Sequence, residues 1–346
     1  MDVKSVGLAI LYLGAERGTS LDRANALRRL GHQVDQIDLG RLLPKSAWVH
    51  AVTHFLGGHL LSPLIVRSLP AVVERANYDL CYIDGGHWVN PRVIRLLRRY
   101  AKKVVNYNID DPLGARDGAK SKAYRQSVPY YDLCVVMRPI NIAEAKELGA
   151  KNVMLVSRSA DEIEHAPREL TQQDRDLWNS EVLFLGTWFP ERGPFLVELV
   201  TRGVPLTIRG ANWHKAPEWP TLRSYWKGGP LAGDDYAKAI QCAKVNLGLL
   251  SKGNRDLHTT RSLEIPALGG LLCGERTTEH MAMYDDGKEA LFWSTAEECA
   301  AICRKVVTDE SLCRQISAAG HARSIRNGNS NENVMRAIIE RACALP

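Results

Sequence analysis

Apolar strands alternate with helices from the start of this 346-residue chain, and this alternation limits its fold more than any other feature. An apolar run at residues 5–13 precedes a helical pattern at 21–30, which Gly31 ends as a C-cap, and a second strand follows at 33–39. This β-α-β order builds a parallel sheet with helices on its faces. The first loop lacks the G-x-G-x-x-G fingerprint, which argues against a dinucleotide-dependent dehydrogenase.

The same order begins again in the second half of the chain. Residues 157–179 are polar and weakly periodic, which is typical of a linker, and an apolar strand follows at 181–186. The chain is long enough for two domains that each bury a core. We therefore predict an α/β protein with two doubly wound, Rossmann-like lobes: a first lobe at 1–160, a linker at 161–180 and a second lobe at 181–325.

The stretch at residues 252–273, KGNRDLHTTRSLEIPALGGLLC, holds several groups that suit a phosphorylated sugar ligand. It predicts a short helix with Ser262 as its N-cap, and the unpaired N–H groups of a helix start attract phosphate. Arg261 adds a fork of donors that fits phosphate oxygens. Glu264 can accept hydrogen bonds from a ribose diol, and Asp256 adds a second carboxylate on the loop that leads in. The alternative is an ordinary capped helix with an Arg261–Glu264 ion pair.

The residues Arg261, Glu264, Ala267 and Gly269 fit the pattern R-x-x-E-x-x-A-x-G. The stretch thereby resembles the second-lobe signature of group 1 glycosyltransferases, in particular the CgeB-type (spore-maturation-protein-like) branch. The wider group has two glutamates in an E-x7-E arrangement, and this chain keeps the spacing with Asp256 in the first place. The resemblance implies the GT-B fold, in which two Rossmann-like lobes face each other across a cleft that holds a nucleotide-sugar donor.

The resemblance also implies donor-binding and catalytic residues, and it places the segment 326–346 back on the first lobe. In related enzymes a glycine follows the first strand of the second lobe, and a nearby cation meets the diphosphate. A histidine of the first lobe often lies near the transferred sugar. His87 follows a predicted strand at 78–84, although a loop histidine is more often solvated or structural. The implied donor-binding residues are Gly186, Thr187, Arg192, Arg209, Gly210, His258, Arg261 and Glu264, and the implied catalytic residues are Asp256 and His87.

Residues that follow strands of the first lobe form the expected acceptor side. The sequence Asp110-Asp111-Pro112 follows a strand and resembles a motif of the CgeB-type branch, with an Asx-turn as the alternative. The two carboxylates are adjacent and point apart in extended backbone, so they do not form the D-x-D motif of a metal site. We therefore expect no metal and no cofactor. The acceptor-side residues are Gly14, Asp84, Asp110 and Asp111.

Cysteine usage and charge indicate where the protein works. None of the eight cysteines forms a C-x-x-C pair and most lie in apolar runs, which favours small buried side chains in a reducing cytosol over zinc or disulfides. No run reaches the roughly 18 apolar residues that a membrane span needs. The net charge is +6, and residues 1–160 hold 23 Lys and Arg against 14 Asp and Glu.

A basic helix predicted at residues 92–103 places Arg92, Arg95 and Arg99 on one face. Together with the apolar segment at 48–69, this face is expected to dock on an anionic bilayer that carries a lipid-linked acceptor. A solvated helix face is the alternative. Nucleic acid is not expected, because no aromatic side chains are interleaved with the cations. The predicted location is the cytoplasm, with peripheral attachment at the inner membrane face.

Together with the lack of a D-x-D motif, the resemblance implies a metal-independent, hexosyltransferase-like glycosyltransferase. It would move a sugar from a nucleotide-diphosphate sugar to a glycan, lipid-linked or other acceptor. A positive helix end with Arg192 and Arg261 would stabilise the departing nucleoside diphosphate. The resemblance to the E-x7-E group favours retention of the anomeric configuration. Two alternatives stay open: a nucleotide-sugar epimerase, and a non-catalytic nucleotide-sugar-binding protein, which the shorter Asp256 side chain would suit.

Overall fold

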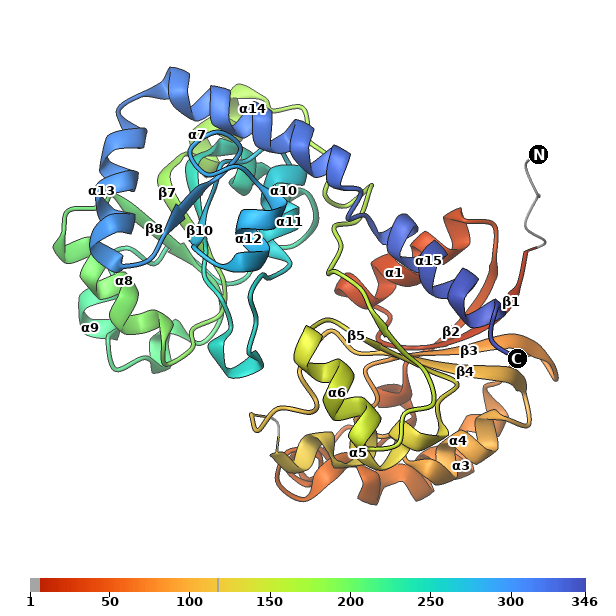
Figure 1. Cartoon of the computed structure of the whole chain (residues 1–346). Helices are drawn as coiled ribbons and strands as arrows, with labels where there is room; N and C mark the ends of the chain where they lie inside the picture. The colour runs from red at the N-terminus through yellow and green to blue at the C-terminus, as the bar shows by residue number, and fades with distance from the viewer. Residues whose placement is uncertain (1–6, 117) are drawn as a thin grey trace, which may run out of the picture. The chain divides into compact units, whose positions relative to one another are not determined.

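The computed structural model describes residues 7–116 and 118–346, so residues 5 and 6 of the first predicted strand lie outside the described chain. Its residues form two compact units (Figure 1). The predicted linker at 161–180 falls within the second unit. The first unit comprises Met1–Arg158, Gly253–Arg255 and Asn331–Pro346, and the second comprises Ser159–Lys252 and Asp256–Ser330.

Six parallel strands form the sheet of the first unit, in the order β2-β1-β3-β4-β5-β6. Side chains alternate across it, so that Leu11 and Leu13 face one apolar core whereas Ile10 and Tyr12 face another. Because both faces are apolar, helices cover both. The strands are β1 Ala9–Leu13, β2 Gln33–Ile37, β3 Tyr78–Asp84, β4 Ala101–Tyr107, β5 Leu133–Val136 and β6 Val153–Leu155. The α-helices are α1 Gly18–Arg29, α2 Ala47–Ala51, α3 Ser62–Ser68, α4 Pro91–Leu97, α5 Lys122–Ser127, α6 Pro139–Glu147 and α15 Asn331–Cys343.

The last helix, α15, packs on the first unit. Met335 and Ile338 of α15 share a buried core with Ala24 and Leu27 of α1, and Figure 1 shows the two helices side by side. This is the return of the C-terminal helix that the predicted fold requires.

Five parallel strands form the sheet of the second unit, in the order β11-β10-β9-β7-β8. Here Val182 and Phe184 face one core, and Leu183 and Leu185 the other. Two α/β units with parallel sheets confirm the predicted fold class. The strands are β7 Ser180–Leu185, β8 Leu206–Arg209, β9 Ala243–Gly248, β10 Leu272–Glu275 and β11 Leu291–Trp293. The α-helices are α7 Gln172–Trp178, α8 Arg192–Thr201, α9 Trp219–Leu222, α10 Gly233–Cys242, α11 Arg261–Ala267, α12 Thr278–Met283, α13 Ala296–Val307 and α14 Glu310–Asn327.

Residues Ala47–Ala71 form a bent helical segment of the first unit. After α2 the helix widens into a π-helical turn at Val52–Gly57, and Gly57, with a φ of 103°, redirects the chain. By length and composition the segment could cross a membrane, and 39% of its most apolar window is buried inside the protein. The sequence analysis considered only unbroken apolar runs. This segment passes on its mean hydropathy, with histidine, serine, threonine and glycine among its residues.

The basic helix predicted at residues 92–103 is shorter than expected. α4 ends at Leu97, and β4 begins at Ala101, where the β-branched pair that follows favours a strand. Arg92 and Arg95 therefore lie on α4, whereas Arg99 lies in the turn after it. All three arginines are exposed.

Candidate functional site

The predicted donor-binding residues follow the carboxyl ends of three strands in the second unit. Gly186 follows β7, Gly210 follows β8, and Asp256 and His258 lie on the loop between β9 and α11. Since neighbouring parallel strands end at one edge of a sheet, these loops gather there.

Glu264 of α11 is a buried carboxylate, with 2% of its surface exposed. Its Oε2 accepts a hydrogen bond of 2.6 Å from Tyr236 Oη and pairs with Arg261, and His165 Nε2 lies 3.5 Å from Oε1. Burial raises the pKa of the carboxyl group, but Arg261 and His165 more than offset this, so that the pKa is lowered overall. The carboxylate is therefore ionised and held in place.

Arg261 is the cation beside this carboxylate. Its Nε donates to the carbonyl of Leu185, the last residue of β7, at 3.2 Å, and its guanidinium carbon lies 4.6 Å from the centroid of the Tyr236 ring. Burial lowers the pKa of Arg261, whereas Tyr236 and Glu264 raise it overall, so the charge is permanent. Because 30% of the side chain is exposed, this fixed cation can still meet an anion.

The start of α11 differs from the prediction. Ser262 is the second residue of the helix, not its cap. Its Oγ accepts a hydrogen bond of 3.1 Å from the backbone N–H of Thr259 and lies 2.7 Å from His280 Nε2. The helix has seven residues and includes Pro266. The prediction of an anion site here therefore depends on the side chain of Arg261 rather than on the helix end.

Arg192 ties two loops of this edge together. It is buried, and it donates to the carbonyls of Thr187 at 2.9 Å and of Leu249 and Leu250 at 3.2 Å each. Its guanidinium carbon also lies 4.5 Å from the centroid of the Phe189 ring. Arg192 thus holds the loop after β7 against the loop after β9. Its contact with a diphosphate stays a prediction.

Two glycines allow the loops after β7 and β8 to touch. Gly210 has a φ of 145°, and a Cβ there would lie 1.9 Å from the carbonyl oxygen of Gly186. Trp213 donates its Nε1 to the same oxygen at 3.0 Å and packs in the core. Arg209 lies over the ring of Trp178, 4.8 Å from its centroid, and burial lowers its pKa.

A Gly210→Ala substitution is expected to lower the free energy of unfolding by about 2–4 kcal/mol, since backbone strain and overpacking add. Gly203→Ala is the matched control, because Gly203 also has a positive φ, 79°, but a Cβ there would meet nothing within 4 Å. We expect the control to lose only about 1 kcal/mol. Chemical denaturation measures both, and equal losses would show that the close approach to Gly186 is unimportant.

Asp256 and His258 are both buried, with 6% and 4% of their surfaces exposed. His258 Nδ1 contacts the carboxylate of Glu279 in the first turn of α12. Thr277 Oγ1 donates to the carbonyl of Leu257 at 2.6 Å. The loop that carries the predicted catalytic carboxylate is therefore anchored on α12.

Arg255 precedes Asp256 directly and belongs to the first unit. Its Nη2 lies 2.9 Å from Asp111 Oδ1, and its Nη1 lies 2.7 Å from Glu144 Oε1. These pairs hold Arg255 at a φ of 53°, a conformation that costs a residue with a side chain roughly 1–2 kcal/mol. Burial raises the pKa of Asp111, but Arg255 and Asn141 lower it overall. Asp111 thus has a structural contact, and its role toward an acceptor stays a prediction.

The other acceptor-side residues lie at the ends of β1 and β3. Asp84 accepts hydrogen bonds from Tyr12 Oη at 2.6 Å and from Arg23 Nη2 at 2.8 Å. Gly14 packs against this group, because a Cβ there would lie 2.6 Å from the Tyr12 ring. The ion pair makes Asp84 part of the framework of this edge.

His87 and Asp110 lie on loops after β3 and β4. The loop of His87 is anchored on the segment Ala47–Ala71, since Trp88 Nε1 donates to Thr53 Oγ1 at 3.0 Å. The backbone N–H of Asp110 donates to Asn108 Oδ1 at 3.1 Å, so an Asx-turn made by Asn108 leads into the Asp110-Asp111-Pro112 motif.

Sequence reasoning missed His165, Tyr236 and Glu279. Each contacts a predicted residue, but each comes from a segment far away in the chain. No local pattern marks them, because their positions depend on how α10, α12 and the segment before α7 pack around α11.

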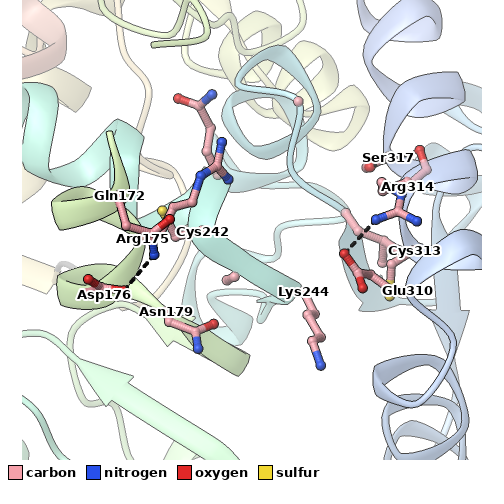
Figure 2. Close-up of a pocket in the computed structure, with 14 residues that line it drawn as sticks. Gln172, Arg175, Asp176, Asn179, Cys242, Lys244, Glu310, Cys313, Arg314 and Ser317 are labelled. Atoms are coloured by element: carbon pink, nitrogen blue, oxygen red, sulfur yellow. Dashed lines mark hydrogen bonds and ion pairs between the residues drawn. The ribbon is translucent and has the colours of Figure 1, made fainter. Parts of the chain in front are cut away.

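A hollow of about 650 Å³ lies elsewhere in the second unit (Figure 2). Asn179, Ala243 and Lys244 line it at the starts of β7 and β9, and Arg314 and Glu310 of α14 complete it. This is the amino edge of the sheet, opposite the edge that carries the predicted donor residues.

Comparisons with known proteins agree with this geometry. A family described as "Glycosyl transferase-like" matches residues 192–340. A sucrose-phosphate synthase from Thermosynechococcus elongatus has a similar structure, with a TM-score of 0.70, 12% identity and coverage of 96% of this chain and 97% of that one. Anabaena Alr3699/HepE, solved with UDP and glucose, gives a TM-score of 0.64 at 14% identity, covering 98% of this chain and 100% of its own.

A trehalose-6-phosphate synthase studied for glycosyl transfer with retention gives a TM-score of 0.63 at 12% identity, with coverage of 98% and 99%. No curated protein sequence matches the chain significantly. The chain therefore has the two-lobed GT-B fold of these glycosyltransferases, and its residues 192–340 match the sequence pattern of the "Glycosyl transferase-like" family.

Proposed function

We propose that the protein is a glycosyltransferase that uses a nucleotide-diphosphate sugar as its donor. The observation that carries this proposal is the Arg261–Glu264 pair on α11, within the matched residues 192–340, where Arg261 also bonds to the last residue of β7. It places a fixed cation beside an ionised carboxylate. These are the groups that a diphosphate and a ribose diol need.

The proposed reaction needs little from the protein except positioning and charge. The bond between the sugar carbon and the diphosphate oxygen breaks and its electron pair stays on that oxygen. The acceptor oxygen bonds to the same carbon, and its proton passes to the departing diphosphate. Arg261 stabilises the charge that develops on the diphosphate, while Glu264 orients the nucleoside through its hydroxyl groups. Asp256 binds the sugar. The related structures with UDP, UDP-glucose and a retaining mechanism support a uridine nucleotide and retention.

We also propose that the chain belongs to the CgeB-type branch, on the pattern formed by Arg261, Glu264, Ala267 and Gly269.

The first experiment is a thermal-shift panel of nucleotide sugars, since a ligand at 100 times its Kd adds about 2.7 kcal/mol to the stability of the folded state. Transfer of the sugar to an acceptor is then expected, and EDTA should not inhibit this transfer. Donor isomerisation without acceptor would indicate an epimerase, and binding without turnover a binding protein.

The proposed acceptor is lipid-linked and reached at a membrane surface. The segment Ala47–Ala71 exposes apolar side chains, with Phe55 at 79%, Leu56 at 59% and Leu60 at 52% exposed. Its opposite face is buried through residues such as Leu61 and Ile65, so we propose docking on the bilayer rather than crossing it. The final helix of the segment, α3, packs beside α4, which carries two of the exposed arginines.

Replacing Arg92, Arg95 and Arg99 with glutamate is expected to abolish sedimentation with anionic liposomes in low salt. Each cation near such a surface contributes about 1 kcal/mol, so the three together change binding by roughly 100-fold. A Phe55→Ser, Leu56→Ser double variant should also lose binding, since it removes the inserted apolar side chains.

The control is a triple variant with the same change in net charge, in which glutamate replaces Lys215, Arg223 and Lys288. All three are exposed residues of the second unit. This control should sediment like the unaltered protein. Negligible binding of the unaltered protein, or equal losses in both triple variants, would point to a soluble acceptor.

A further inference from the structure

Three cysteine thiols meet inside one apolar core of the second unit. Cys273 lies in β10, and Cys299 and Cys303 lie one turn apart on the same face of α13. Their three Sγ atoms all lie within 4.8 Å of one another. All three residues are fully buried. The fold therefore gathers three soft donor atoms at one point.

Two other buried cysteines, Cys313 and Cys134, have a different environment. Cys313, which belongs to the same apolar core, donates its thiol to the carbonyl of Val306 at 3.1 Å. Cys134 lies 3.8 Å from the carbonyl of Val128. Such contacts are typical of cysteines that act as small core residues, whereas the thiols of the cluster face one another.

We propose that Cys273, Cys299 and Cys303 form a binding site for one copper(I) ion. Sulfur ligands of cysteine select soft ions such as Cu(I), whereas Mg²⁺ and Ca²⁺ need oxygen ligands. Structural zinc sites have four ligands. Among the residues that the structure describes, no fourth histidine, cysteine or carboxylate joins the group. Three sulfur atoms suit trigonal Cu(I).

Charge balance is consistent with this ion. Binding one Cu(I) to one thiolate and two neutral thiols releases one proton and leaves the cluster without net charge. A neutral cluster matters here, because the site lies in a core of apolar side chains such as Leu247 and Trp293, and an uncompensated charge in such a core is costly. The reaction needs no oxidant or reductant.

The ion would join β10 to α13 and so stabilise the second unit. Because the thiols are fully buried, copper must enter during folding or when α13 opens locally. Slow loading and slow loss to a chelator are therefore expected. Copper on the exposed Cys343 would exchange rapidly.

The test is the copper content of the full-length protein, expressed with added copper, purified without oxygen and analysed by plasma mass spectrometry. We expect about one copper per chain, at least about tenfold less in Cys299→Ala and Cys303→Ala, and no change in Cys313→Ala or Cys343→Ala. Loading should raise the Tm of the unaltered protein but not that of Cys303→Ala.

X-ray absorption of the loaded, unaltered protein gives an answer even if the variants fail to fold. Three sulfur neighbours around copper are expected. Nitrogen or oxygen neighbours, two sulfurs only, or copper that Cys303→Ala retains in a folded state would overturn the proposal. So would less than about one tenth of a copper per chain after expression with copper and after refolding the full chain with Cu(I).

Discussion

An Arg261→Ala variant is expected to bind UDP at least about tenfold more weakly than the unaltered protein, because a charge-assisted hydrogen bond to phosphate contributes about 1.5–3 kcal/mol. It is also expected to unfold more easily. Glu264 is 2% exposed, and removing one partner of a buried pair costs about 3–5 kcal/mol. The lower end is expected here, since Tyr236 and His165 still face the carboxylate.

A double variant separates the two effects. Arg261→Ala combined with Glu264→Gln removes both charges, so its free energy of unfolding should recover part of the loss, while UDP affinity stays low. Calorimetry measures the affinity and chemical denaturation the stability. If Arg261→Ala bound UDP with unchanged affinity, this arginine would not belong to the donor site.

The pair also has a defined pH dependence. The pKa of Glu264 is lower in the folded protein than in the unfolded chain. Its contribution is therefore fully present above the unfolded pKa of about 4.3 and is lost as the pH falls through the folded pKa. The stability difference between the unaltered protein and the double variant should shrink in that acidic range.

An Asp256→Asn variant is expected to turn over about 100-fold more slowly while binding UDP with normal affinity. The substitution keeps the size of the side chain but removes the charge proposed to act on the sugar, and losing one such preorganised group typically costs 100-fold to 1,000-fold in rate. Turnover is measured as UDP release in the presence of acceptor, and affinity by calorimetry.

Glu264→Gln is the matched comparison, because it also neutralises a carboxylate of the same motif. This variant should bind UDP more weakly, since Glu264 is assigned to the nucleoside. Turnover of Asp256→Asn at the normal rate would mean that the carboxylate pair is a coincidence of spacing.

The sequence predicted the fold class, and it predicted that the candidate residues follow strand ends at one edge of a sheet, because both depend on local patterns. Strand and helix periodicity is read within a few residues, and parallel strands end at a common edge. The Arg261–Glu264 pair lies three residues apart on one helix, so its contact follows from helix geometry. The ordinary ion pair, which was the alternative interpretation, and the proposed donor site therefore consist of the same two residues, Arg261 and Glu264.

The sequence did not predict contacts between distant segments. Glu264 meets His165 and Tyr236, and Arg255 meets Asp111, through packing that no local pattern records. Element ends were also missed, as at α4, where an apolar strand competes with the basic helix for residues 101–103.

The cysteines show most clearly which features follow from the sequence and which depend on the tertiary structure. From the sequence alone, the alternation of strands and helices determined a two-lobed α/β protein, and scattered spacing argued against a cysteine site. Only the tertiary structure decided that Cys273 meets Cys299 and Cys303. Strand and helix geometry fix which side of an element a residue faces, but the packing of β10 against α13 fixes what it faces, and that depends on side chains throughout the core.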